Sequence, residues 1–193
     1  ARRLCAQLGV ELTVLEADIL SVPCVAENPP DRCYHCKRAL FGALRERALA
    51  DGFSVLLDGT NASDDAGDRP GMRAIAELQV RSPLRECGIT KAQVRALSKE
   101  AGLFTWDKPA YACLATRLPT GETITPEVLQ KVEAAEDALF SLGYKDLRVR
   151  VFHGGARLQL PGEQLERAAK ERKVILQALS PWFDTVLLDL KER

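Results

Sequence analysis

Hydrophobic and polar residues follow two alternating patterns in the first part of the chain. Apolar residues at helical spacing predict helices at 1–8, 32–50, 73–78 and 91–101. Apolar residues that alternate with polar ones predict strands at 10–15 and 53–57. Because helices and strands alternate along the chain, we expect a parallel α/β sheet in this part of the molecule.

Short polar signals indicate where these helices begin and end. Asp31 is the expected N-cap of the long helix, and Gly9 follows the first helix as a C-terminal cap. Thr90 and Gln93 have the spacing of a capping box, and Gly102 ends the helix that they begin.

The pattern changes beyond residue 121. A helix at 126–142 follows the N-cap Thr125, and two strands at 147–152 and 156–160 are joined by a turn. A further helix at 163–179 and a strand at 185–189 complete an α-β-β-α-β unit. We therefore expect an α/β domain at 1–120 and a small α+β domain at 121–193.

Composition indicates a soluble globular protein. The 193 residues are 46% hydrophobic and 28% charged, which is enough for a substantial core. Lysine plus arginine (27) equals aspartate plus glutamate (27), so no overall basic field would attract nucleic acid. Apolar runs stay shorter than the roughly 20 residues of a membrane span, and no leader pattern is evident. We expect a cytoplasmic protein that binds neither membrane nor nucleic acid.

Three of the six cysteines suggest chemistry. Cys33 and Cys36 form a CxxC pair, and Cys113 lies far downstream. A closed structural zinc site normally uses four ligands, whereas an iron–sulfur cluster or a catalytic metal can use three and keep one position open. In a reducing compartment a disulfide framework is not expected. The remaining cysteines fit small buried or incidental positions: Cys5, Cys24 and Cys87.

An acidic, glycine-bearing loop follows the second predicted strand. It runs over 58–65, where the carboxyl edge of a parallel sheet usually binds ligands. Carboxylates are the ligands that Mg²⁺ prefers, although such loops are often only solvated turns. The candidates are Asp58, Asp64, Asp65 and Asp68, of which we favour Asp64.

Together these segments resemble one family over essentially the whole chain. It is the LarE family of ATP-dependent sulfur transferases, which mature the nickel-pincer nucleotide cofactor of lactate racemase and belong to the PP-loop ATP pyrophosphatases. Asn-Pro-Pro-Asp precedes the cysteine pair, and Cys-Leu-Ala-Thr-Arg begins at the third cysteine. The segments that carry the resemblance are 28–37, 58–65, 69–71, 81–84, 106–109 and 112–117.

The resemblance implies a fold and an activity. Residues 1–120 would be a PP-loop (adenine nucleotide alpha hydrolase-like) domain without its first strand and its Ser-Gly-Gly-x-Asp-Ser loop, which we expect to precede this chain. Such enzymes use ATP and Mg²⁺ to adenylate a carboxylate of a pyridinium mononucleotide, release pyrophosphate, and form a thiocarboxylate. A sulfide donor and a homo-oligomer are the expected partners.

The resemblance leaves two sources of sulfur open. Cys113 falls where the family has its sulfur-handling cysteine, which some members sacrifice to dehydroalanine. In three-cysteine members, the equivalents of Cys33, Cys36 and Cys113 are thought to hold a 4Fe-4S cluster whose fourth iron binds hydrosulfide. We favour the cluster, because the first turn of a helix and the nearby Lys37 suit two thiolates.

Several charged residues are further candidates, although each can also have an ordinary structural role. Lys37 suits nucleotide phosphate, and Arg117 suits the Cys113 thiol or the adenylate. Arg148 and Arg150 alternate along a strand, so both face one side and suit a phosphate or a second carboxylate. Glu136 suits either a metal site or simple helix formation.

Other functions remain open on the sequence alone. A PP-loop tRNA thiolase would activate a base carbonyl, although the neutral net charge argues against it. A metal-binding module would use the three thiols structurally and would unfold on chelation. An amidotransferase-like ligase that uses ammonia would need none of the cysteines.

Overall fold

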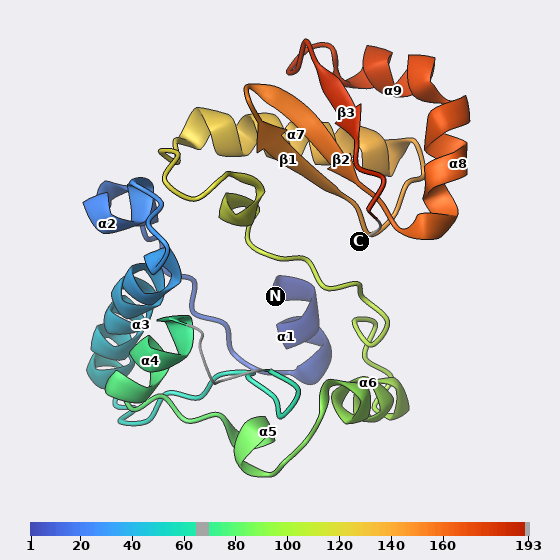
Figure 1. The fold of residues 1–193 in the computed structure, drawn as a ribbon. Coiled ribbons are helices and arrows are strands. Elements are labelled where there is room, and N and C mark those ends of the chain that lie inside the picture. Colours follow the sequence, from blue (N-terminus) through green and yellow to red (C-terminus); the bar gives the residue numbers. More distant parts are fainter. Residues whose placement is uncertain (65–69, 192–193) are drawn as a thin grey trace. The chain divides into compact units, whose positions relative to one another are not determined.

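The chain forms two units in the computed structural model, which describes residues 1–64 and 70–191. One unit comprises Ala1–Val25 and Pro30–Lys108, and the other comprises Ala26–Pro29 and Pro109–Arg193 (Figure 1). This division falls nearer the N-terminus than residue 120, because the short helix η2 (Leu114–Arg117) packs on elements of the second unit.

Helices dominate the described part of the first unit. They are α1 (Arg2–Leu8), η1 (Ile19–Ser21), α2 (Pro23–Ala26, at the boundary), α3 (Arg32–Ala50), α4 (Pro70–Glu77), α5 (Pro83–Glu86) and α6 (Lys91–Glu100). The predicted caps are confirmed: Gly9 is left-handed with φ 64°, Asp31 is the N-cap of α3, and Thr90 and Gln93 form a complete capping box. Local signals therefore located α1, α3 and α6 correctly, whereas the short helices η1, α2 and α5 were not predicted.

The two strands predicted in this unit do not form. Residues 10–15 have no ladder, and 53–57 contribute only an isolated parallel bridge between Leu57 and Arg81. No neighbouring strand completes a ladder within the described residues, so the apolar side chains stay outside a core: Val10 is 54% exposed and Phe53 is 67% exposed. The parallel sheet expected here is thus not formed in the part of the unit that the structure describes.

The second unit is built around a three-stranded sheet. Its elements are α7 (Pro126–Ser141), β1 (Arg148–Phe152), β2 (Gly155–Gln159), α8 (Gly162–Lys170), α9 (Arg172–Leu179) and β3 (Val186–Leu188). The strand order is β1-β2-β3, with β1 antiparallel and β3 parallel to β2. The predicted α+β character of this part of the chain is confirmed.

One predicted helix of this unit is two helices. The sequence suggested a single helix at 163–179, but Glu171 separates α8 from α9 with φ −87° and ψ 14°. The carboxylate of Glu171 accepts hydrogen bonds from Tyr144 and Arg167, at 2.9 and 3.0 Å. This break carries no glycine or proline, so no local signal announced it.

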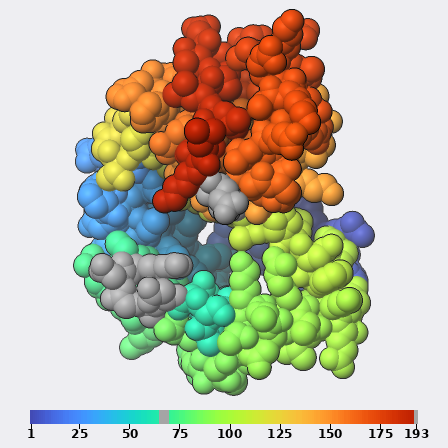
Figure 2. Space-filling model, turned by 45° about the vertical axis from the view of Figure 1, so that its right-hand side comes forward, coloured from blue at the N-terminus to red at the C-terminus, as the bar shows by residue number. Residues whose placement is uncertain are grey.

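The core of the second unit lies on one face of the sheet. Val149 and Leu158 of the strands pack with Leu139 of α7, all nearly fully buried. Residues 126–191 of this unit are coloured from yellow to red along the chain in Figure 2. None of the helices in the described residues has the length and hydrophobicity that a membrane crossing requires. The helices, the sheet and this core make the protein a mixed α/β chain with a well-packed second unit.

Candidate functional site

A pocket in the first unit contains three of the residues singled out by the sequence. Cys33 and Lys37 come from the first turns of α3, where a spacing of four residues puts both on one face. Asp64 comes from the loop that follows residues 53–57. The pocket has a volume of about 300 Å³, and its lining residues are Cys33, Lys37, Thr60, Asp64, Pro70, Gly71 and Met72.

Gly71 leaves room for the lysine in this pocket. A Cβ atom at Gly71 would lie 3.0 Å from Cδ and 3.2 Å from Cε of Lys37. Those distances are tighter than ordinary van der Waals contact, so any side chain at position 71 would push the lysine aside. The segment at 69–71 stood out in the sequence only through the family resemblance, and no role was predicted for Gly71.

Hydrogen bonds hold the acidic loop beside the pocket. The Asp58 carboxylate accepts a hydrogen bond from the hydroxyl of Thr60 and another from the hydroxyl of Ser82, each at 2.6 Å. Burial raises the pKa of the Asp58 carboxyl, but these hydrogen bonds and the charge of Lys37 outweigh it, so the pKa lies below its usual value. Asp58 is therefore an anion near the Lys37 ammonium.

Asp64 is fixed by the same loop. Its Oδ2 accepts a hydrogen bond from the backbone N–H of Asn61 at 3.0 Å, and its carbonyl accepts one from Arg85 at 2.6 Å. The Lys37 ammonium and the Asp64 carboxylate line one pocket, and these groups suit a phosphate with a divalent cation. Asp65 and Asp68, the other predicted ligands, lie outside the described residues.

The cysteine pair lies at the start of α3. Cys33 is exposed and Cys36 is half-buried, three residues apart on neighbouring helix positions. Arg32 donates a hydrogen bond to the Cys33 sulfur at 3.7 Å. His35 instead pairs with Asp31, with 3.2 Å between Nε2 and Oδ2. Within each unit, the described residues include no group of three or more His, Cys, Asp or Glu side chains that could hold a metal ion.

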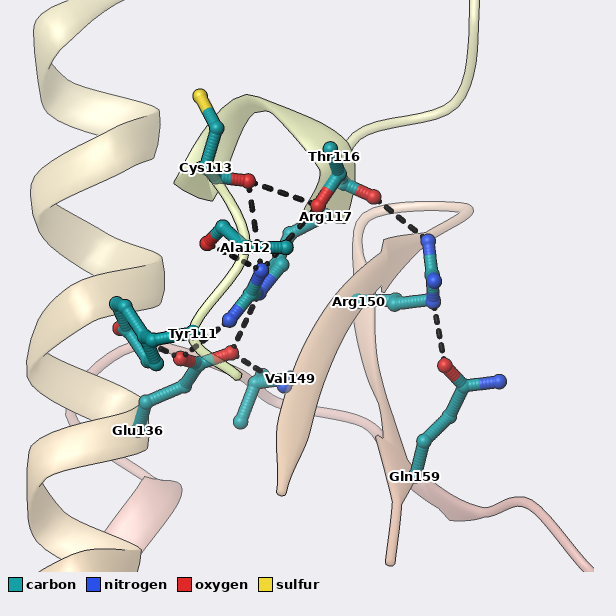
Figure 3. A network of polar contacts seen from close by, with 9 residues as sticks. All are labelled: Tyr111, Ala112, Cys113, Thr116, Arg117, Glu136, Val149, Arg150 and Gln159. Atoms are coloured by element: carbon teal, nitrogen blue, oxygen red, sulfur yellow. Dashed lines mark hydrogen bonds and ion pairs between the residues drawn. The ribbon is translucent and has the colours of Figure 1, made fainter. Parts of the chain in front are cut away.

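Cys113 belongs to the second unit. It is exposed and is the N-cap of η2, and its carbonyl accepts hydrogen bonds from the N–H and hydroxyl of Thr116, at 2.9 and 2.7 Å. Figure 3 shows the sulfur pointing away from the Arg117 guanidinium, whereas the Cys113 carbonyl oxygen faces it. The backbone at this cysteine is thus anchored while its thiol is accessible.

Arg117 is almost completely buried, with 1% of its side chain exposed. Its Nε and Nη2 donate to the two carboxylate oxygens of Glu136 at 2.8 and 3.0 Å, and Nη1 donates to the carbonyl of Ala112 at 3.0 Å. The guanidinium is therefore engaged by Glu136 and by backbone oxygens. This pairing was not predicted from the sequence.

Arg148 and Arg150 lie on one face of β1, as their alternation predicted. Arg150 donates hydrogen bonds to the side chain of Gln159 and, at 2.6 Å, to the carbonyl of Thr116. Arg150 thus also holds the segment that follows Cys113. Phosphate binding by either arginine stays a prediction.

Known proteins resemble this chain over most of its length, although no family model matches it. An uncharacterized protein of Synechocystis sp. is 42% identical over 164 residues, which is 85% of this chain and 61% of that protein. The pyridinium-3,5-bisthiocarboxylic acid mononucleotide synthase of Lactiplantibacillus plantarum is 35% identical over 191 residues, which is 98% of this chain and 69% of the synthase.

A third relative extends the similarity to an archaeon. An uncharacterized protein of Methanocaldococcus jannaschii is 29% identical over 178 residues, or 92% of this chain and 69% of that protein. The chain thus spans 61 to 69% of the length of these relatives.

Proposed function

Because the chain belongs to the LarE family, the family of the pyridinium-3,5-bisthiocarboxylic acid mononucleotide synthase, we propose that it is part of an ATP-dependent sulfur transferase. Its substrate is a pyridinium mononucleotide that carries a carboxylate, and its product is the thiocarboxylate. The observation that carries this proposal is the grouping of Cys33, Lys37 and Asp64 in one pocket of a chain from this family.

The first step activates the carboxylate. A carboxylate oxygen attacks the α-phosphorus of ATP, the bond to the leaving pyrophosphate breaks, and an acyl-adenylate forms. Lys37 neutralises phosphate charge, and Asp64, with the anionic Asp58 nearby, would hold Mg²⁺, which would neutralise further phosphate charge. The residues fit this task because the Lys37 ammonium and the Asp64 carboxylate line the same pocket, and the Asp58 carboxylate lies near the lysine.

The second step transfers sulfur. A sulfur nucleophile attacks the acyl carbon, the bond to the AMP oxygen breaks, and the thiocarboxylate remains. With hydrosulfide as nucleophile, Cys113 keeps its sulfur. With Cys113 as nucleophile, loss of its Cα proton and cleavage of its Cβ–S bond leave dehydroalanine.

A 4Fe-4S cluster is the sulfur carrier that we favour. Cys33 and Cys36 fit two of its thiolate positions, since they lie on neighbouring positions of one helix with an arginine beside one sulfur, and Cys113 offers an exposed third thiol. When bound, such a cluster would supply an open iron for hydrosulfide. Arg148 and Arg150 bind the nucleotide phosphate in this scheme, and the enzyme acts as a homo-oligomer with a separate sulfide donor.

Pyrophosphate release tests the activation step. Intact protein is incubated without oxygen with ATP, Mg²⁺, sulfide and the carboxylated pyridinium mononucleotide. We expect Lys37→Ala and Asp64→Asn to slow pyrophosphate release by about 100-fold, as the loss of a charge-stabilising group usually does. Arg45→Ala removes an exposed cation of the same helix and should leave the rate unchanged. Substrate-independent or undetectable pyrophosphate release by the wild type would contradict the proposal.

Iron content tests the cluster separately. Protein reconstituted without oxygen should contain about four irons and four acid-labile sulfides per chain. The variants Cys33→Ala, Cys36→Ala and Cys113→Ala should each lose them, whereas Cys87→Ala should not. A wild type without iron would leave Cys113 as the sulfur donor.

A further inference from the structure

Glu136 is the shared hydrogen-bond acceptor of several residues inside the second unit. Its side chain is fully buried on α7, and its carboxylate accepts hydrogen bonds from three residues. It accepts two hydrogen bonds from Arg117, one from the hydroxyl of Tyr111 at 2.8 Å and one from the backbone N–H of Val149 in β1 at 2.9 Å. The bonds from Arg117 and Val149 satisfy buried groups that would otherwise be costly to bury.

Two of the residues that donate these bonds lie on either side of Cys113 in the sequence. Tyr111 precedes the cysteine by two positions and Arg117 follows it by four, and both are bound to the same carboxylate (Figure 3). Arg117 also restrains the backbone next to the thiol, because its Nη1 donates to the carbonyls of Ala112 and Cys113 at 3.0 and 3.4 Å. Glu136 therefore restrains the backbone on both sides of an exposed thiol.

A buried ion pair is not needed for stability alone. Well-packed apolar residues of similar volume often stabilise a protein as well as a buried pair does, whereas a charge that loses its partner is strongly destabilising. What the pair provides here is a fixed geometry, since a bidentate arginine–carboxylate contact allows one orientation.

We propose that Glu136 is a positioning residue for Cys113: through Arg117 and Tyr111 it holds the segment 111–117 so that the thiol meets the activated substrate in one orientation. The inference rests on the proposed function, in which Cys113 takes part in sulfur transfer. Glu136 itself touches neither substrate nor sulfur, so its effect is on the transfer step and not on carboxylate activation.

The chain contains a matched control. Tyr144, Glu171 and Arg167 form a trio of the same residue types in the same unit, with hydrogen bonds of 2.9 Å from the tyrosine and 3.0 Å from the arginine to the glutamate. Its ion pair is more exposed, at 42% for Arg167 and 37% for Glu171. Arg167 also lies over the Tyr144 ring at 4.3 Å, as Arg117 lies over Tyr111 at 5.1 Å. This second trio flanks no cysteine, so its loss should affect stability without affecting sulfur transfer.

The test compares Glu136→Gln with Glu171→Gln in the intact protein. Two readouts are used: hydrogen exchange of peptides from 110–117, and the amount of thiolated product formed per pyrophosphate released. We expect Glu136→Gln to speed exchange in this segment and to lower the product-to-pyrophosphate ratio by about tenfold or more, as misplacement of a reacting group does. Glu171→Gln should change neither readout.

A milder pair covers the case in which Glu136→Gln does not fold. Tyr111→Phe and Tyr144→Phe each remove one hydroxyl. Tyr111 is 56% exposed, so removal of its hydroxyl leaves the core intact. Tyr111→Phe should lower the product-to-pyrophosphate ratio in the same direction, and Tyr144→Phe should not. A folded Glu136→Gln or Tyr111→Phe with wild-type exchange or a wild-type ratio would overturn the inference.

Failure of the proposed function would look different. A wild type that releases pyrophosphate but forms no thiolated product, or that releases none, would contradict the proposed sulfur transfer itself. Hydrogen exchange in 110–117 would then still decide whether Glu136 holds the segment, because that readout needs no substrate.

Discussion

Glu136 and Arg117 are two of the few charged or polar side chains that the described residues bury almost completely, at 0% and 1% exposure. Their pairing could not be read from the sequence, because the two lie 19 positions apart and a glutamate in a helix is usually only a good helix former. Cys33, Lys37 and Asp64 were easier, since motif spacing marks them without reference to distant contacts. At the residue scale, local spacing could mark candidate residues, but it could not predict which residues pair over long distances along the chain.

Gly71 gives a direct test of the pocket. Gly71→Ala should displace Lys37, because the new Cβ would lie 3.0 Å from its Cδ, and should slow pyrophosphate release. Gly42→Ala is the control: it lies within α3 with open space around it, and should stabilise the protein by about 0.5–1 kcal/mol without changing the rate. Equal pyrophosphate-release rates in both variants would exclude a role for the Gly71 contact.

Tyr111 gives a spectroscopic test of the Glu136 network. Burial of the hydroxyl and its hydrogen bond to Glu136 raise the pKa of Tyr111 to about 12. Since the neutral phenol is favoured in the folded state, the stabilisation is complete below the ordinary pKa of about 10 and is lost as the pH rises toward 12. The difference in tyrosinate absorbance between wild type and Tyr111→Phe should therefore titrate near pH 12. A midpoint near 10 would show that the network is absent.

Helices and strands differed in how far the sequence determined them. Helix ends depend on neighbours along the chain, so the caps at Asp31, Thr90 and Thr125 were predicted correctly. Strands need partners from elsewhere. The segments 147–152 and 156–160 pair with each other because a short turn joins them. The segments 10–15 and 53–57 have no ladder among the described residues.

The capping box of α6 provides the test at this scale. The Thr90 hydroxyl accepts a hydrogen bond from the N–H of Gln93, and the Gln93 side chain accepts one from the N–H of Thr90 at 2.9 Å. Thr90→Ala should lower the free energy of unfolding by about 1 kcal/mol. Thr123→Ala, at an exposed loop position, should have almost no effect in the same denaturant titration. Identical midpoints for both variants would argue against the cap.

At the scale of the whole molecule, the two units divide the proposed work. The first unit contains the pocket with Lys37 and Asp64, and the second contains the restrained Cys113 segment. The sequence located both sets of residues through its motifs, and the family resemblance is confirmed by the synthase relative. The sequence did not reveal Gly71 as a contact of Lys37 or Glu136 as the anchor of the cysteine, because both depend on segments distant along the chain.

The most direct test of the central claim is the amount of thiolated nucleotide formed per protein chain, measured by mass spectrometry for wild type, Cys113→Ala and Cys87→Ala. We predict thiolated product from wild type and from Cys87→Ala, and none from Cys113→Ala. More than one product per chain would support hydrosulfide as the nucleophile, and at most one would support sacrifice of Cys113. Undiminished thiolation by Cys113→Ala would contradict the claim that this cysteine takes part in sulfur transfer.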